Sequence, residues 1–156
     1  MSRQSYFALA VGVVLVVACD RPGQRPSTVT MDADTYAVKE AALAHVIREF
    51  APSGECRLII TDSEYSKRLV AALSQSTAAD CCGPEQWRVE NGAYFDAETG
   101  QPVVLLGAEI VAIGRRHATV EVELDAGFDG GTWYTVQLRK DGVDWIVEFA
   151  ELVAHS

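Results

Sequence analysis

Cys19 is the residue whose position says most about the chemistry of this chain. It follows an uncharged apolar run over residues 6–18, and the only charged side chain before that run is Arg3. The length and composition of this run are typical of the hydrophobic part of a secretory signal peptide. A membrane-spanning helix needs about 20 apolar residues, and this run is shorter. Cys19 stands where such a peptide would carry its small-residue cleavage site. We therefore predict that Cys19 is a lipid attachment site. The alternatives are a simply secreted chain, in which Cys19 is incidental, and an uncleaved anchor.

The four residues Val16-Val17-Ala18-Cys19 resemble the lipobox of bacterial lipoprotein precursors. The resemblance implies diacylation of the Cys19 sulfur, removal of a signal peptide over residues 1–18, and a mature chain that starts at Cys19. Asp20 resembles the signal that keeps lipoproteins in the inner membrane of some Gram-negative lineages. The location expected from this resemblance is extracytoplasmic and lipid-anchored to the cell membrane. In a Gram-negative host this would be the periplasmic face of the inner membrane.

The remaining chain divides into a tether over residues 19–31, which is polar and proline-rich, and a single domain over residues 32–156. Removal of the signal peptide would also remove Arg3, which leaves twelve basic and 22 acidic side chains and a formal charge of minus ten. Such a surface repels nucleic acid and anionic lipid headgroups. We therefore expect no nucleic-acid partner. The expected contacts are the membrane, through the lipid anchor, and a protein of the cell envelope.

Three further cysteines, Cys56, Cys81 and Cys82, leave an odd number once Cys19 is acylated. A disulfide from Cys56 to Cys81 or Cys82 would close a loop of about 25 residues and contribute about 3 kcal/mol. The alternatives are a disulfide between the adjacent Cys81 and Cys82, or one reactive thiol. No Cys-x-x-Cys spacing occurs and the histidines are scattered, so we expect no metal site.

Catalytic motifs are missing from the sequence. It has no nucleophile elbow, zinc-protease helix motif, phosphate-binding glycine loop or calcium loop. We therefore predict no catalytic residues and no cofactor, which favours a non-enzymatic domain. The best pocket candidate is Glu109, because it lies in an otherwise apolar stretch over Val103–Ile113 where desolvation would favour the neutral acid. His45 could join it in a pocket. The alternative is that Glu109 faces solvent near the next turn, or lies on the sheet surface opposite Glu121.

Trp133 is a candidate contact residue. It has the outward parity of its predicted strand and stands next to an acidic row that includes Glu123 and Asp125. An exposed aromatic side chain near a glycine-rich turn is typical of a protein or glycan contact. The partner surface would then be basic. Alternatively, Trp133 covers the far face of the sheet together with Ile146 and Val111.

The first half of the domain predicts two helices and one strand. An Ala-rich helix is expected over residues 34–50, with Asp32 or Asp34 as its N-cap. A short strand over residues 57–61 should follow. Residues 61–64 have the spacing of a capping box, so a second helix is expected after them.

The second half predicts an antiparallel meander. Residues 118–128 alternate between apolar and polar, and after a glycine turn the alternation continues through Tyr134, Val136 and Leu138. We expect Leu124 opposite Tyr134, Val122 opposite Val136, and Val120 opposite Leu138. A turn at Asp141-Gly142 would set Leu138 opposite Trp145 and Tyr134 opposite Phe149. The predicted fold class is α+β, with two N-terminal helices packed on a mainly antiparallel meander sheet of about four or five strands.

This pattern, with Asp141-Gly142 and Trp145-Ile146-Val147 near its end, resembles the nuclear-transport-factor-2-like cone fold, and a cystatin-like sheet is the nearest rival. In the cone family the sheet holds a ligand or a catalytic Asp/His pair in some members and serves as an interaction scaffold in others. No matched pair is found here. The leading prediction is a membrane-anchored lipoprotein with a non-enzymatic domain for protein interaction or envelope support. The alternative is a pocket-bearing domain that binds or transforms a small ligand through Glu109 and His45.

Overall fold

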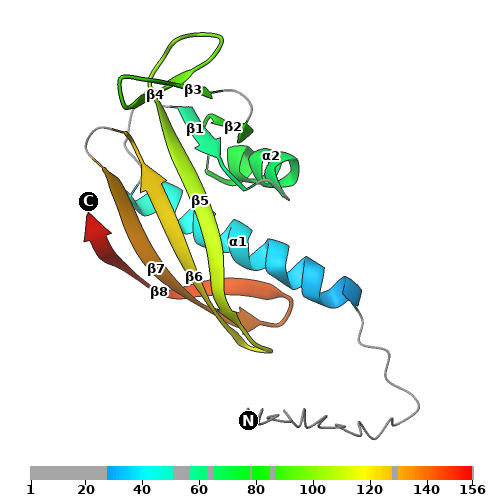
Figure 1. Cartoon of the computed structure of the whole chain (residues 1–156). Helices are drawn as coiled ribbons and strands as arrows, with labels where there is room; N and C mark the ends of the chain where they lie inside the picture. Colours follow the sequence, from blue (N-terminus) through cyan, green and yellow to red (C-terminus); the bar gives the residue numbers. More distant parts are fainter. Residues whose placement is uncertain are drawn as a thin grey trace, which may run out of the picture.

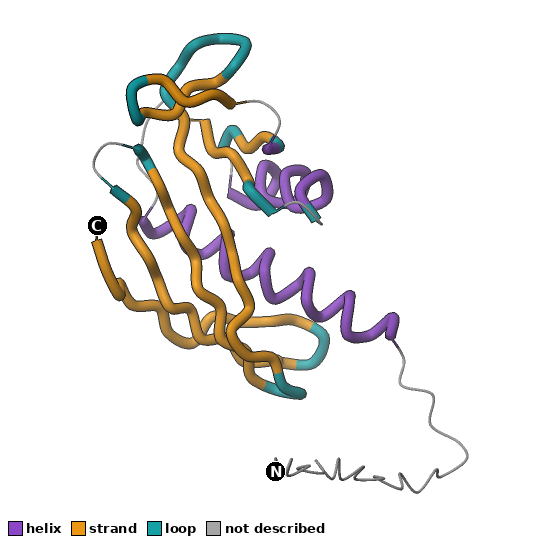
Figure 2. Tube along the Cα trace, in the orientation of Figure 1, coloured by secondary structure: helices purple, strands orange, loops and turns teal. Residues whose placement is uncertain are grey.

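The computed structural model describes residues 28–50, 57–62, 65–77, 79–84, 87–127 and 130–155, so Cys19 and Cys56 lie outside the described residues. The described residues form two helices and eight strands, and Figures 1 and 2 show how these are arranged. In chain order these are α1 (Thr28–Phe50), β1 (Arg57–Ile60), α2 (Ser66–Thr77), β2 (Cys81–Cys82), β3 (Trp87–Glu90), β4 (Ala93–Asp96), β5 (Val103–Ile113), β6 (His117–Asp125), β7 (Gly131–Asp141) and β8 (Asp144–His155).

The main sheet is mixed and has six strands in the order β2-β1-β5-β6-β7-β8, while β3 and β4 form a separate two-stranded sheet. β1 is parallel to both β2 and β5, and the strands from β5 to β8 form an antiparallel meander. The predicted sheet of about four or five strands is therefore wrong, and α2 is a crossover between β1 and β2. Parallel pairing has no local turn signal because it needs a long connection, and β2 has only two residues.

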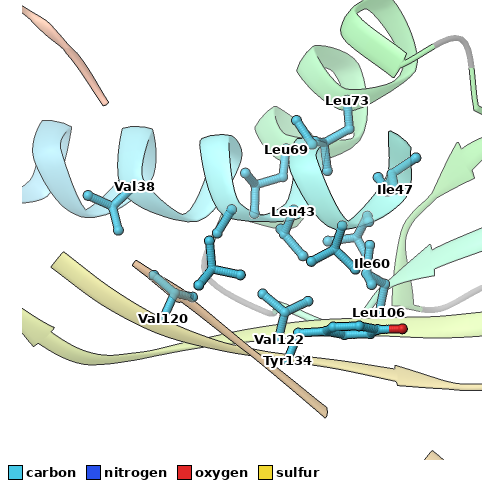
Figure 3. Packing of buried hydrophobic residues seen from close by; sticks show 14 of the residues in the cluster. Val38, Leu43, Ile47, Ile60, Leu69, Leu73, Leu106, Val120, Val122 and Tyr134 are labelled. Atoms are coloured by element: carbon cyan, nitrogen blue, oxygen red, sulfur yellow. The ribbon is translucent and has the colours of Figure 1, made fainter. Parts of the chain in front are cut away.

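The core lies between α1 and one face of the main sheet, which we call the inner face (Figure 3). The buried positions of α1 recur at helical spacing, and the alternate residues of β6 point towards them. The sheet curls around α1, as Figure 1 shows. Side chains that are almost completely buried here include Val38, Leu43, Val46, Val120, Val122 and Val136. We call the opposite face the outer face, and of the described elements only β3 and β4 cover it.

The hairpin of β3 and β4 covers the outer face at one end. Its turn residues Asn91 (φ 50°) and Gly92 (φ 85°) are both left-handed, as a type I′ hairpin requires. Trp87 and Tyr94 from this hairpin pack against a second apolar cluster of Ile59, Cys82 and Val103. Beyond this hairpin, no other described helix or strand covers the outer face of β5, β6 and β7.

The predicted cap of the first helix is wrong because α1 begins at Thr28, so that Asp32 and Asp34 both lie within the helix. Asp34 instead binds the turn between β7 and β8. Its Oδ1 accepts hydrogen bonds from Lys140 Nζ at 2.5 Å and from Trp145 Nε1 at 3.3 Å. The hydrogen bond from Lys140 lowers the pKa of Asp34. This contact holds the tip of the last hairpin against α1.

The second helix is capped by Asp62, one residue later than the capping box predicts. The Asp62 Oδ1 accepts a hydrogen bond from the Tyr65 backbone N–H at 2.9 Å, three residues on, which is the geometry of an N-cap. The Thr61 hydroxyl instead donates to the Leu106 carbonyl at 3.2 Å. Thr61 therefore holds the end of β1 to β5.

The register between β6 and β7 is two residues from the prediction. Val122 lies opposite Tyr134 and Val120 opposite Val136. A shift of two residues keeps every side chain on its face, because side chains alternate with a period of two. The inner and outer sets of these two strands are therefore as expected although the pairs are not.

The register between β7 and β8 departs further from the prediction. The turn residues are Gly142 and Val143, so that Leu138 lies opposite Val147 instead of Trp145. Only Gly142 of this pair has positive φ, at 65°. A bulge at Gln137/Leu138 then places one extra residue in β8, which reverses the faces that follow. Phe149, predicted to face inward, is 49 % exposed as a result.

Asp96 at the end of β4 is the one buried charged residue among those described, with 1 % exposure. It accepts hydrogen bonds from the Thr99 N–H at 2.6 Å, the Glu98 N–H at 2.9 Å and Arg57 Nη1 at 2.5 Å. These bonds, the one from the Thr99 backbone first, lower the pKa of Asp96 to about 2. The carboxylate thus ties the loop after β4 to the start of β1.

Candidate binding site

A hollow of about 410 Å³ opens on the outer face, at the edge of β5. It forms because β1 ends at Ile60, which pairs with Leu106, whereas β5 continues to Ile113. We call it the acidic hollow. It is lined by Lys39, Thr61, Asp62, Gly107, Ala108, Glu109, Glu121, Glu123 and Trp133.

Three exposed glutamates give the acidic hollow its charge. Glu109 on β5 lies directly opposite Glu121 on β6. Glu123 lies between Gly107 on β5 and Trp133 on β7. All three point outward because the residues on either side of them in sequence face α1. Carboxylates directly opposite each other repel, so a bound cation would relieve an unfavourable contact of the free protein.

Among the described residues, Lys39 is the one basic residue that lines the acidic hollow. It comes from α1 and forms an ion pair with Asp62, and the two side chains are only 15 % and 5 % exposed. Asp62 thus compensates the ammonium group at the base of the hollow. The uncompensated charge of the lining is therefore that of the three glutamates.

Two glycines shape the acidic hollow. A Cβ on Gly131 would lie 2.8 Å from Cη2 of Trp133 and 3.3 Å from Oε1 of Glu123, so the indole ring lies against this bare backbone. A Cβ on Gly107 would lie 2.9 Å from the Thr61 Oγ1. An indole beside carboxylates is a combination that attracts organic cations, through the ring face and through charge-assisted hydrogen bonds.

Asp125, predicted to share the contact surface, has two partners within the fold. Its Oδ2 accepts a hydrogen bond from the Tyr94 hydroxyl at 2.7 Å, and its Oδ1 accepts one from the Gly127 N–H at 2.9 Å. The hydrogen bond to Asp125 raises the pKa of Tyr94. Asp125 thus attaches the β3–β4 hairpin to β6, and it also borders a smaller recess of about 70 Å³ that shares Glu123 and Gly107 with the acidic hollow.

The proposed pairing of Glu109 with His45 is not found. Glu109 is exposed on the outer face, and the second half of β5 is more exposed than predicted. His45 belongs to α1, which packs on the inner face, and its ring lies against Phe50 with 6.0 Å between ring centroids. His45 is not among the described residues that line the acidic hollow with Glu109, so the two side chains do not share that hollow.

Trp133 does not cover the outer face together with Ile146 and Val111. Ile146 pairs with Arg139, six residues along β7 from Trp133. Val111 lies at the β5 bulge and is 57 % exposed, while Ile146 is 44 % exposed. Trp133 is instead half-buried against Gly131 and belongs to the wall of the acidic hollow.

Cys81 and Cys82 are free thiols in the structure, each 7 % exposed, so the disulfide between these neighbours is not formed. Desolvation raises the pKa of both thiols, that of Cys82 to about 11. Such thiols are almost fully protonated at neutral pH and are poor nucleophiles. Cys81 packs in the core on the inner face and Cys82 in the cluster under the β3–β4 hairpin.

Sequence reasoning found the glutamates and Trp133 but not the rest of the lining. Lys39 and Asp62 were missed because they reach the acidic hollow only through the packing of α1 and the early end of β1. Gly107 carried a usable signal, since a glycine inside a strand often marks a close approach of other groups.

Among the residues that the structure describes, no group of three His, Cys, Asp or Glu side chains is arranged to hold a metal ion. No helix in that part of the chain combines the length and the apolar character needed to cross a membrane. No family model, no curated protein and no solved structure matches the chain.

Proposed function

We propose that this protein is a lipid-anchored component of the bacterial cell envelope whose domain binds a basic segment of a partner protein in the acidic hollow. The observation that carries the proposal is the convergence of Glu109, Glu121, Glu123 and Trp133 in one hollow, where the only basic residue of the described lining is already ion-paired. A lysine or arginine of the partner would lie against the indole, between the carboxylates.

The energetics favour a segment with several basic residues over a single small cation. An exposed cation–π contact contributes about 0.5–1 kcal/mol and an exposed ion pair about 0.2–1 kcal/mol. One cation that meets Trp133 and two carboxylates would therefore gain at most about 3 kcal/mol, which is weaker than millimolar affinity. Useful affinity requires additional contacts, which a protein segment supplies.

The proposed location rests on Cys19 and its resemblance to a lipobox. A lipid on Cys19 would hold the domain close to the membrane, and the formal charge of minus ten would keep the domain from adsorbing to anionic headgroups. A partner would then be bound by a part of the domain surface that has a specific shape and charge. The acidic hollow is such a part.

The test is binding of a fluorescein-labelled heptapeptide in which lysine alternates with threonine or valine, compared with the same peptide carrying glutamate for lysine. We expect the lysine peptide to bind at low ionic strength and to weaken as salt is added. The double variant Glu121→Gln/Glu123→Gln should lose about 1 kcal/mol, roughly a fivefold decrease in affinity.

The matched control is Glu49→Gln/Glu98→Gln, which removes the same charge from exposed positions on α1 and in the loop after β4. This control should bind the lysine peptide within twofold of the parent chain. Equal losses in the two double variants would show that net charge alone attracts the peptide and would contradict a site in the acidic hollow.

A further inference from the structure

The strand β5 has an open edge next to the acidic hollow. β1 pairs with β5 only from Val103 to Leu106, where the last contact is the Thr61 N–H donating to the Leu106 carbonyl at 3.0 Å. From Gly107 to Ile113, no described strand lies on this side of β5. Figure 1 shows β1 beside only the upper part of β5, whose lower part continues without a described strand on that side.

The backbone groups that face this edge follow from the alternation of the strand. Because the Leu106 carbonyl points towards β1, the N–H and C=O groups of Ala108 and Ile110 point the same way, while Gly107 and Glu109 face β6. Ala108 and Ile110 lie before the bulge of β5. Unpaired donors and acceptors in a row are a template for an additional strand.

We propose that the basic segment binds as an added β-strand on the open edge of β5, with its lysine or arginine side chains beside the acidic hollow. The proposal rests on the proposed function and specifies its binding mode. Charge complementarity identifies the occupant, since an added strand would place alternate side chains on the outer face, next to Glu109. The other alternate side chains would lie above α1, near Ala108 and Ile110, and would be small or apolar.

At the opposite edge of the sheet, β8 pairs with β7 and has no described strand on its other side, and it exposes apolar side chains, among them Phe149 and Val153. It lies three strands away from β5, with β6 and β7 between them. An added strand on β8 would therefore not place its basic side chains beside Glu109 and Glu121. The charge of the acidic hollow favours the β5 edge.

The experiment uses the full chain in a neutral detergent and the lysine heptapeptide in three forms. One form is unmodified. The second is methylated at the backbone nitrogen of every lysine, and the third is methylated at the backbone nitrogen of every other residue. Each methylated form loses the hydrogen-bond donors of one strand edge and keeps every charge. Strand addition predicts that one of the two methylated peptides binds at least tenfold more weakly, while the other stays within twofold of the unmodified peptide.

Amide hydrogen exchange locates the bound peptide. We expect the Ala108 and Ile110 amides to exchange fast in the free protein and slowly in the complex, with no change along β8. The variant Ala108→Pro provides a second check. Proline lacks the backbone N–H that an added strand would bind, and the β5–β6 ladder does not use the N–H of residue 108. This variant should melt within a few degrees of the parent chain and should bind the unmodified peptide at least tenfold more weakly.

The outcomes separate this proposal from the proposed function. If both methylated peptides bind as well as the unmodified one, the acidic hollow binds basic groups by charge alone and strand addition is refuted. Protection of β8 amides instead of Ala108 and Ile110 would refute it too. If the unmodified peptide does not bind at all, the proposed function fails and strand addition with it.

Discussion

Glu109 and Glu121 stand directly opposite each other across β5 and β6, both exposed on the outer face. Cross-strand carboxylates repel, so this pair lowers the stability of the free protein while it favours a cationic partner. We predict that Glu121→Gln raises the free energy of unfolding by a few tenths of a kcal/mol at low ionic strength and weakens lysine-peptide binding. Urea denaturation and fluorescence anisotropy measure the two effects.

The salt dependence of both effects provides the control for the Glu109–Glu121 pair. Adding salt should diminish both effects, because screening weakens interactions between exposed charges. A Glu121→Gln protein that is less stable than the parent at low ionic strength would show that Glu121 makes a favourable contact, and would contradict this account of the surface.

The position of the Trp133 ring depends on the bare backbone of Gly131. We predict that Gly131→Ala displaces the ring, because the new Cβ would lie 2.8 Å from Cη2 of Trp133. Binding of the lysine peptide should fall two- to fivefold, the value of an exposed cation–π contact of about 0.5–1 kcal/mol. The NMR signal of the Trp133 indole N–H should shift in the free protein.

Gly114→Ala is the matched control for this substitution. Its Cβ would meet the His117 carbonyl oxygen at 3.5 Å, an ordinary contact, and Gly114 has no positive φ. This variant should leave the Trp133 signal and peptide binding unchanged. An unshifted Trp133 signal in Gly131→Ala would show that the ring does not rest on Gly131 in solution.

Acid should weaken the attachment of the loop after β4 through Asp96. The folded-state pKa of about 2 lies below the ordinary value of 3.8, so protonation disfavours the folded state. The contribution of Asp96 is complete above about pH 4 and is lost as the pH falls towards 2. Asp96→Asn should therefore lower stability at neutral pH and flatten its fall between about pH 4 and pH 2.

Urea unfolding at a series of pH values measures this effect. Glu98→Gln is the control, because it removes an exposed carboxylate two residues away and leaves the Arg57 contact in place. An Asp96→Asn protein whose stability falls as steeply as that of the parent below about pH 4 would show that other carboxylates dominate the acid transition.

The thiols of Cys81 and Cys82 should be almost unreactive in the folded chain. Both are buried, and the pKa of Cys82, raised by desolvation to about 11, leaves a very small thiolate fraction at neutral pH. We expect alkylation by iodoacetamide to be slow in buffer and fast in urea. Mass spectrometry of the labelled peptides distinguishes Cys81 from Cys82 and also reports whether Cys56 carries a disulfide.

Lipid attachment is tested directly by intact mass and membrane fractionation in the native host. We expect a mass that begins at Cys19 and includes acyl chains, and we expect Cys19→Ala to leave the membrane fraction. The lysine-peptide affinity of the solubilised Cys19→Ala chain should equal that of the parent, since the proposed site is built from residues of the domain. An unmodified parent chain in the soluble fraction would refute the anchor.

The local pattern of the sequence predicts strands better than it predicts their neighbours. The apolar stretch over Val103–Ile113 coincides with β5, and the alternation in β6 gives the correct inner residues. The pairing partners were wrong because a shift of two residues leaves the alternation unchanged. The parallel position of β1 depends on the crossover through α2, which no turn motif marks.

The acidic hollow was predictable only in part for the same reason. Glu123 and Trp133 come from adjacent strands, so parity alone places them on one face. Lys39 and Asp62 come from α1 and the segment after β1, and they reach the hollow because β1 is seven residues shorter than β5. The sequence does not show how far β5 extends beyond β1 until the register between these two parallel strands is known.

Asp62 links the choice of ligand to the integrity of α2. One of its oxygens accepts the hydrogen bond that begins the helix, and the other neutralises Lys39 at the base of the hollow. A neutral residue at this position would release an ammonium group towards the bound ligand and loosen the first helical turn at once. In the proposed site, a change of charge at Asp62 would therefore also cost folding stability, whereas none of the three glutamates begins a helix.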